Sequence, residues 1–221
     1  AGVVNFQPNG GNGTADISST TFNLRADGPT AGNGDAGVIY FATSGLTLSS
    51  TTKSVFSAKG ATAGTGKGGF ITVFPGAIAD YKLGTNPGNL QVLADGGLNG
   101  GDAGRINVNP FPGSITIDTA DAVSAKAQGG NAKGGFIQLV GNPNLTVNPA
   151  ANGSTINVDG KGTGNAGEIH IFAQGTLALG NTAGSLSLSA QGDPTGTGDG
   201  GIIEIAYTTN LTTSGTLSVS A

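Results

Sequence analysis

Residues 165–192 read NAGEIHIFAQGTLALGNTAGSLSLSAQG, and this stretch is one copy of a unit that recurs along the whole chain. It opens with a small residue, a glycine and an apolar-rich run, AGEIHIF from Ala166. A second short run follows, TLAL from Thr176, and a third run ends in a small residue, a polar residue and glycine, SAQG from Ser189. A glycine-rich link then leads to the next copy.

The opening motif occurs seven times at nearly even spacing. Its glycines, called anchor glycines below, are Gly2, Gly37, Gly69, Gly104, Gly135, Gly167 and Gly201, with spacings of 35, 32, 35, 31, 32 and 34 residues. A fixed period in this range is typical of a solenoid, in which each unit buries its apolar face against its neighbours. We therefore predict one β-solenoid domain over residues 1–221, with coils that start near residues 1, 36, 68, 103, 134, 166 and 200.

Alternation within the opening run indicates a β-strand. The residues two and four positions after the anchor glycine are apolar and form two inward columns: Val4, Ile39, Ile71, Ile106, Ile137, Ile169 and Ile203, and Phe6, Phe41, Val73, Val108, Leu139, Ile171 and Ile205. The residue between them is polar or amphipathic, as an outward position should be. No helical period occurs. We predict an all-β fold, a parallel β-helix solenoid of about seven coils of 31–35 residues with three short strands per coil.

One coil departs from the pattern. In the copy that starts near residue 68, the second run reads IADYKL from Ile78 and breaks the alternation. We expect a bulge or an excursion there.

Charged residues fall into two further columns when the copies are aligned. The residue two before each anchor glycine runs Asp35, Lys67, Asp102, Lys133, Asn165 and Asp199, and the penultimate position of the third run gives Asp27, Lys59, Asp95, Gln128, Asp159 and Gln191. Like charges stacked at the strand spacing of about 4.8 Å would repel. We interpret both columns as devices that set the register between coils; chance alternation is the alternative.

Composition excludes several classes of protein. Glycine contributes 42 of 221 residues without a collagen period, and the 36% hydrophobic content is enough for a core. The net charge is −4 with only 10% charged residues, so we expect no nucleic-acid binding. No apolar stretch is long enough for a membrane helix, and we expect no membrane insertion. The absence of cysteine excludes disulfides, thiolate zinc sites and a cysteine nucleophile.

Aspartates in the glycine-rich links raise the question of calcium. The stretches GNGDAG from Gly32, NGGDAG from Asn99 and GTGDGG from Gly196 are similar to calcium-binding glycine nonapeptides. The period is not nine, however, and lysine replaces aspartate in alternate coils, where it would oppose the ion. We therefore assign no metal and no cofactor, and interpret the glycines as turn residues; an isolated calcium site is the alternative.

The outward column of the opening strands holds the one candidate for acid–base chemistry. Gln138, His170 and Glu204 follow one another in successive coils, with Arg105 and Glu168 nearby. One histidine and one glutamate without an orienting group or nucleophile form a weak constellation. We interpret them as a solvated ladder and assign no catalytic residue; a catalytic or glycan-contacting pair is the alternative.

Apolar residues also occupy outward positions of the same strands. They are Val38, Phe70, Phe136 and Ile202, one after the anchor glycine, and Phe74, Val140 and Phe172, five after it. The simplest interpretation is that the strand ends bend at the corners and bury them. A lateral interface or a carbohydrate platform is the alternative.

The order of these runs resembles the repeats of filamentous-haemagglutinin-like proteins and related autotransporter passengers. The likeness lies in a GG- or AG-led strand, a short LxL strand and a strand that ends in A-x-G, and residues 165–192 carry it best. It covers nearly the whole chain but is one of repeat style. The resemblance implies a right-handed β-helix, secretion by a Gram-negative-type bacterium and a role in adhesion or surface structure. It brings no catalytic residues.

Function follows from these observations as an expectation. Methionine is absent, and both ends fall at coil boundaries without a polar cap, so we expect a processed form or a segment of a longer rod, or a subunit that associates end to end. We expect a non-enzymatic, extracellular or cell-surface structural or adhesive rod, with surface glycans as further partners. The alternative is a carbohydrate-binding or polysaccharide-processing β-helix protein.

Overall fold

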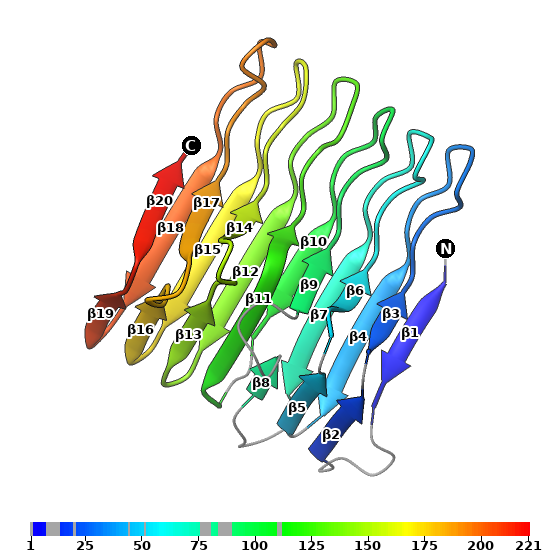
Figure 1. Cartoon of the computed structure of the whole chain (residues 1–221). Coiled ribbons are helices and arrows are strands. Elements are labelled where there is room, and N and C mark those ends of the chain that lie inside the picture. The colour runs from blue at the N-terminus through cyan, green and yellow to red at the C-terminus, as the bar shows by residue number, and fades with distance from the viewer. Residues whose placement is uncertain are drawn as a thin grey trace.

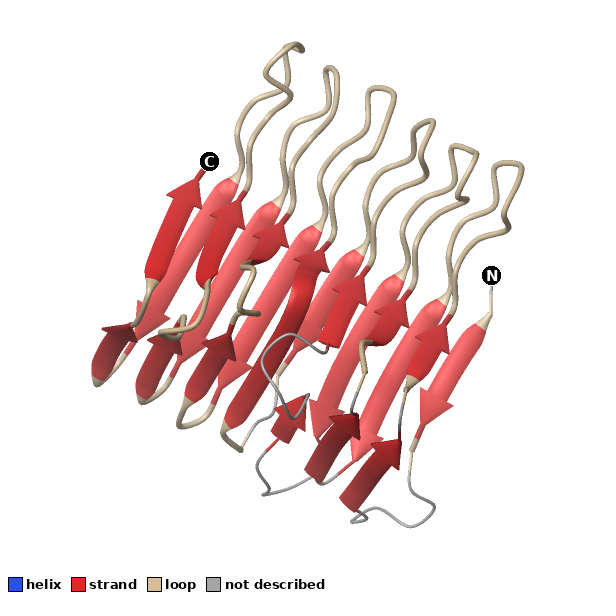
Figure 2. Cartoon of the chain, viewed as in Figure 1, coloured by secondary structure: helices blue, strands red, loops and turns tan. Residues whose placement is uncertain are grey.

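The computed structural model describes residues 2–7, 14–19, 21–43, 45–50, 52–75, 81–83, 90–109 and 112–221. Within these ranges the chain forms strands, turns and loops and no helix (Figure 2). Accordingly, no helix suited to crossing a membrane is found in the described part of the chain. The strands stack along one axis, and the two ends of the chain lie at opposite ends of the stack (Figure 1).

The opening strands form a parallel sheet, called sheet A, in the order β1-β4-β7-β10-β12-β15-β18. Their bounds are β1 (Val3–Phe6), β4 (Val38–Thr43), β7 (Phe70–Pro75), β10 (Arg105–Val108), β12 (Phe136–Gly141), β15 (Glu168–Ala173) and β18 (Ile202–Tyr207). Each strand pairs with the same run of the next coil, so neighbours in this sheet are about one coil apart in sequence.

The other two runs of each coil build sheets B and C. Sheet B contains β2 (Thr14–Ser19), β5 (Gly45–Ser50), β8 (Tyr81–Leu83), β13 (Leu145–Asn148), β16 (Thr176–Leu179) and β19 (Asn210–Thr213). Sheet C contains β3 (Asn23–Arg25), β6 (Ser54–Ser57), β9 (Leu90–Leu93), β14 (Ser154–Asn157), β17 (Ser185–Ser189) and β20 (Thr216–Ser220). The long strand β11 (Ile115–Ser124) belongs to both and joins them into one sheet.

The predicted fold class is therefore confirmed as an all-β, parallel β-solenoid. In the described residues, the seven strands of sheet A enclose six complete turns, and β18, β19 and β20 supply the strands of a further coil. Three strands per coil is the rule, and the exception is the coil in which β11 replaces two of them.

The core confirms the two predicted inward columns. Ile39, Ile71, Ile106, Ile137 and Ile169 pair in succession across sheet A, and each is fully buried. The second column aligns in the same way, but its first member, Phe6 on the end strand β1, is 37% exposed. The alternating exposure of β12 follows directly from the two-residue period of a strand.

Aromatic packing is concentrated in the N-terminal coils. The rings of Phe41 and Phe56 stack with their centroids 5.4 Å apart. Phe6 stacks on Phe41 at 5.1 Å, and Phe22 meets Phe56 edge-on at 5.9 Å. These rings fill the space between sheets A and C that aliphatic side chains fill in later coils.

Each coil closes through its anchor glycine. The N–H of Gly135 donates to the carbonyl of Ala125 at 2.8 Å, and the N–H of Gly167 donates to Val158 at 2.8 Å. These bonds join the end of the third strand to the start of the next opening strand, so the glycine-rich link between them is held at its base. The links project as a row of loops from one end of the sheets (Figure 1).

A side chain cannot replace the anchor glycine inside the stack. A Cβ built on Gly167 would lie 1.8 Å from the carbonyl oxygen of Gly135, and one on Gly135 would lie 2.1 Å from that of Gly104. The backbones of successive coils therefore approach more closely here than any other residue allows.

The irregular coil is only partly within the described residues. The expected excursion around Ile78 falls on residues 76–80 and 84–89, which lie outside them. The described strand β8 pairs with β5 and β11. The pairing of β11 with β9 shifts between Thr119 and Val123, so an irregularity does occur beside this coil.

One of the two charged columns was predicted with a wrong member. The column of Asp35, Lys67 and Asp102 has the predicted register. In the third-strand column, however, the N–H of Gly96 donates to the carbonyl of Lys126, which places Lys126 and not Gln128 beside Asp95. The full column is Asp27, Lys59, Asp95, Lys126, Asp159 and Gln191. Acid and base therefore alternate more strictly than the sequence pattern suggested.

Candidate functional site

The outward face of sheet A carries the candidate site. Because the inward columns are occupied by apolar residues, the side chains at positions one, three and five after each anchor glycine point away from the core. This face combines aromatic rings, among them that of Phe136 on β12, with charged side chains from β10, β15 and β18.

His170 is the centre of that group. Its Nδ1 lies 2.8 Å from Oε2 of Glu204 in the next coil, and its Nε2 lies 3.0 Å from Oε2 of Glu168 on the same strand. His170 and Glu204 lie side by side in successive coils, as their positions in the repeat predict. Glu168 is a second carboxylate partner, placed two residues before His170 on the same face of β15.

An aromatic ring and a guanidinium extend the group toward the N-terminus. The ring of Phe136 lies 5.2 Å from the imidazole of His170, centroid to centroid. The guanidinium carbon of Arg105 lies 4.4 Å from the centroid of Phe136, which is within the range of a cation–π contact. Side chains from four successive strands thus contact one another in a chain: Arg105 contacts Phe136, Phe136 contacts His170, and His170 contacts Glu168 and Glu204. The repeat pattern indicates these residues but does not indicate the stacking of Arg105 on Phe136.

The outward apolar residues remain exposed. Phe70 is 50% exposed, Ile202 54%, Phe74 41% and Phe172 37%. The interpretation that strand ends bend and bury these four side chains is therefore wrong, because β7, β15 and β18 keep their outward positions facing solvent to the strand ends. Phe136 and Val140, from β12, are partly buried. The face is thus an apolar and aromatic surface with a charged row across it.

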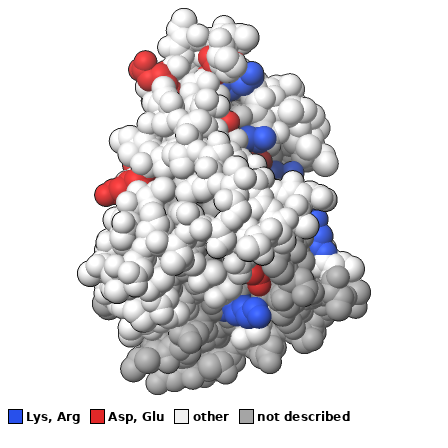
Figure 3. Space-filling model, turned by 60° about the vertical axis from the view of Figure 1, so that its left-hand side comes forward, with Lys and Arg blue, Asp and Glu red and all other residues white. Residues whose placement is uncertain are grey.

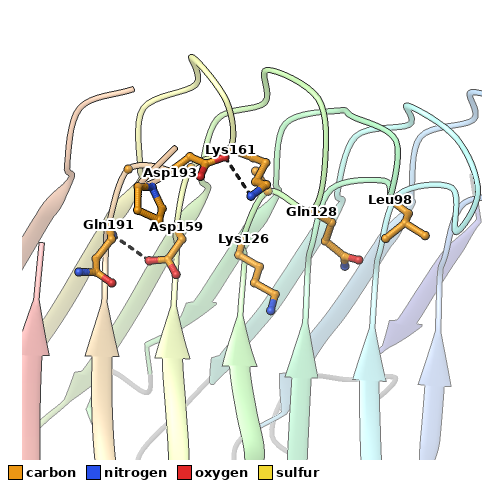
Figure 4. Close-up of a pocket in the computed structure, with 11 residues that line it drawn as sticks. Leu98, Lys126, Gln128, Asp159, Lys161, Gln191 and Asp193 are labelled. Carbon is orange, nitrogen blue, oxygen red and sulfur yellow. Dashed lines mark hydrogen bonds and ion pairs between the residues drawn. The ribbon is translucent and has the colours of Figure 1, made fainter. Parts of the chain in front are cut away.

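A groove lies where the links leave sheet C (Figure 4). Figure 4 shows side chains from successive coils along this groove, of about 360 Å³, among them Leu98, Lys126, Gln128, Lys161 and Asp193. Lys161 Nζ lies 2.9 Å from Oδ2 of Asp193, whose side chain is almost completely buried.

Asp193 is a structural carboxylate. Its Oδ2 also accepts the N–H of Gly162 at 3.0 Å, and its Oδ1 accepts the N–H and the hydroxyl of Thr195. The hydrogen bond from Lys161, with those from Gly162 and Thr195, holds the pKa of Asp193 well below its usual range. Asp193 was not among the candidates predicted from the sequence, although Asp-Pro-Thr is a turn-forming pattern that could have indicated it. All four acceptor contacts stabilise the links, which leaves little capacity for a ligand.

The pKa of Asp118 in β11 is shifted upward, whereas that of Asp193 is shifted downward. Desolvation raises the pKa of its carboxyl group, and the hydrogen bond from Asn148 and the charge of Lys82 oppose that shift. Asn148, which pairs with Asp118 in the next coil, donates a hydrogen bond of 2.9 Å from its Nδ2 to Oδ1 of Asp118. We interpret Asp118 as part of the join between sheets B and C.

The link aspartates that suggested calcium bind backbone instead. Oδ1 of Asp35 accepts the N–H of Lys67 at 2.7 Å, and Oδ1 of Asp102 accepts the N–H of Lys133 at 2.9 Å. At the last junction the roles change, and the N–H of Asp199 donates to Oδ1 of Asn165 at 3.0 Å. In the described ranges, no group of three or more histidine or acidic side chains is arranged to hold a metal ion.

Only 10% of the residues are charged. On the face shown in Figure 3, the acidic and basic side chains lie among much larger uncharged areas. Contact with another molecule over such areas would depend on shape and apolar burial more than on net charge.

Comparison with known proteins adds no family. No family model matches the chain, and no curated protein and no solved structure is significantly similar to it.

Proposed function

We propose that the protein is a non-enzymatic structural rod with an adhesive role at the outer surface of a bacterial cell. The observation that carries this proposal is the continuous register of sheet A, in which every coil places its side chains in the same columns. Such a stack is an extended scaffold that repeats one surface along its length. The repeat style, which resembles filamentous-haemagglutinin-like proteins, supports the surface location.

The use of polar groups supports a structural role. Carboxylates in the links and at the ends of the third strands accept backbone N–H groups of the following coil, as Asp35 and Asp102 do. Hydrogen bonds of this kind hold one coil on the next. The repeat style supports the adhesive part of the proposal, because the resemblance to filamentous-haemagglutinin-like proteins implies a role in adhesion or surface structure.

Location and adhesion can be tested separately. Antibodies against the purified protein should label intact cells of the source bacterium, and labelling only after permeabilisation would contradict a surface location. Beads coated with the protein should adhere to cell layers more than beads coated with serum albumin. Equal adhesion of the two kinds of bead would contradict the adhesive role.

One observation favours a second candidate, a carbohydrate-binding or polysaccharide-processing protein. His170 lies between two carboxylates and beside the ring of Phe136, and aromatic and acidic groups in one place can contact a sugar. Screening a glycan array with the protein and with His170→Ala and Glu204→Gln variants tests this candidate. Loss of glycan binding in both variants would favour it, and release of reducing sugar from a polysaccharide would indicate processing.

A further inference from the structure

The outward face of sheet A has matching residues on either side of β12. In the column one after the anchor glycines, Phe136 is flanked by Arg105 in the preceding coil and Glu168 in the following coil. One coil further out lie Phe70 on one side and Ile202 on the other, and both are about half exposed. Apolar, basic, aromatic, acidic and apolar residues thus follow one another along the stack.

We propose that this face binds a second copy of the chain, with the two rods antiparallel and sheet A packed on sheet A. A two-fold axis along β12 reverses the order of the coils in the second copy. Arg105 of each copy then lies opposite Glu168 of the other, and Phe136 lies opposite Phe136. Phe70 of each copy lies opposite Ile202 of the other. The proposal goes beyond the rod function, because a rod can act with or without lateral pairing.

Charge selects this register. Arg105 stacks on Phe136 and has no acidic partner among the residues that the structure describes. An axis along β10 would place Arg105 against Arg105, and an axis along β15 would place Glu168 against Glu168. Axes midway between strands never bring Arg105 opposite Glu168. Like charges across a packed interface are unfavourable, so the axis along β12 is preferred.

Charge also selects the antiparallel arrangement. In a parallel pair with the same coils opposite each other, the central outward column would meet itself. Glu204 would then lie against Glu204, and His170 against His170. In the antiparallel pair, the residue of this column that lies on the axis and meets its own copy is Gln138. Its amide can both donate and accept a hydrogen bond.

The overlap of the two faces sets the size of the interface. With the axis along β12, the five strands β7, β10, β12, β15 and β18 of each copy face each other, and β1 and β4 extend beyond the contact. Five strands of four to six residues give an overlap of about 20 Å by about 24 Å, from the rise per residue and the strand spacing. Two such faces would bury about 800–1,000 Å² in total, which is the size of a weak, reversible interface. The exposed rings of Phe74 and Phe172 lie on the same face and add apolar area.

A charge swap tests the proposed contact. Sedimentation velocity over a concentration series should give a dimer of twice the 21.3 kDa chain mass. Arg105→Glu and Glu168→Arg should each raise the dissociation constant about tenfold or more, and the double variant should recover most of the affinity. Lys53→Glu, between β5 and β6, is a control of equal charge change away from sheet A, and it should leave the dimer intact. Circular dichroism would confirm that each variant is folded.

Three outcomes would overturn the proposal. They are a monomer at every concentration, a dimer that Arg105→Glu does not weaken, and a double variant that is no better than the single ones. A monomer that binds glycans would assign the face to carbohydrate instead. A monomer that still adheres in the bead assay would overturn the dimer and leave the rod function standing, so the two failures can be told apart.

Cross-linking tests the orientation. Because the chain has no cysteine, single cysteines can be introduced cleanly. Gln138→Cys lies on the proposed axis and should be joined to its copy by a short bismaleimide. Tyr40→Cys lies in the same outward column but three coils from the axis, so it should remain uncross-linked. Efficient cross-linking of Tyr40→Cys would indicate a parallel pair and overturn the proposed geometry.

Discussion

Oδ1 of Asp159 accepts a hydrogen bond of 2.6 Å from the hydroxyl of Ser189, which lies one coil further along the stack. The same oxygen accepts the N–H of Gln191 at 2.8 Å. This N–H needs a side-chain acceptor because the carbonyl that would face it in a regular parallel ladder, that of Val158, is bonded to the anchor glycine Gly167. The aspartate therefore replaces a backbone acceptor that coil closure has removed.

The arrangement recurs in every second coil. Asp27 binds Ser57 and the N–H of Lys59. Asp95 binds Ser124 and the N–H of Lys126. In the coils between, the column holds Lys59, Lys126 and Gln191. A lysine cannot accept these hydrogen bonds, and a glutamine amide accepts them less strongly than a carboxylate does. Each aspartate with the serine and the backbone N–H that it binds in the next coil is called a clamp below, so the clamps join the coils in pairs.

Removal of the clamp should destabilise the rod. Asp159→Ala leaves the N–H of Gln191 without its acceptor, and we expect a loss of about 1–3 kcal/mol in the free energy of unfolding. Asp159→Asn retains an acceptor oxygen and should cost less. Urea denaturation followed by circular dichroism measures both. Asp199→Ala is the matched control, because the Asp199 carboxylate accepts no hydrogen bond in the described part of the chain; a loss there as large as that of Asp159→Ala would refute the clamp.

The anchor glycines should differ sharply in their tolerance of alanine. Gly167→Ala places a Cβ 1.8 Å from a carbonyl oxygen, and we expect a loss of about 2–4 kcal/mol in unfolding free energy. Gly2 occupies the same position in the first coil, but a Cβ there meets nothing within 4 Å. Gly2→Ala should therefore be nearly neutral in the same denaturation experiment. Equal effects at the two sites would mean that conformational freedom, and not close approach, requires the glycine.

The corrected register can be tested with charge. Lys126→Asp would put an aspartate between Asp95 and Asp159 at the strand spacing, and we expect a loss of about 1 kcal/mol that is larger at low salt. Lys126→Gln removes the charge without adding repulsion and should cost less. Thermal unfolding in low and high salt compares the variants. If Lys126→Asp shows no salt dependence, Lys126 is not in this column.

Asp193 should make stability depend on pH in a defined direction. Its folded pKa is lowered by Lys161 and its other donors, so its ionised form stabilises the fold at pH values above the unfolded pKa of about 3.9. That contribution is lost as the pH falls below this value toward the folded pKa. Melting temperatures of the protein and of Asp193→Asn should differ most near neutral pH and converge in acid. A difference that grows in acid would contradict the assignment. Asp118, with its raised pKa, shifts stability the opposite way in both proteins, so it cancels in the comparison.

Much of the fold could be predicted because the repeat is regular in the residues that pack. The inward columns of sheet A follow from alternation alone, and every coil repeats them. Gln128 was predicted wrongly because the segment SAKAQGG offers two matches to the motif, Ala125-Lys126 and Ala127-Gln128. The prediction chose the match that is followed by glycine, Ala127-Gln128. The structure instead aligns Ser124-Ala125-Lys126 with Ser57-Ala58-Lys59. The serine two positions before was the better signal, since it donates to the clamp.

The candidate site was predictable in part. Residues two apart on a strand share a face, so the contact of Glu168 with His170 follows from sequence. The exposure of Phe70 and Phe172 does not, because it depends on whether the strand ends bend, and the backbone decides that. The stacking of Arg105 on Phe136 likewise depends on side-chain rotamers that no repeat pattern specifies.

Spin-label distances along one outward column test the stacked, in-register solenoid most directly. Asn23 pairs with Val55 in sheet C, and Thr155, Ser187 and Ser218 align in the same column in the last three coils. A nitroxide at Asn23 paired with one at Thr155, Ser187 or Ser218 should give distances of about 19, 24 and 29 Å, which rise by about 4.8 Å per coil. Narrow distributions with that slope would confirm the account, and distances that do not increase coil by coil would contradict it.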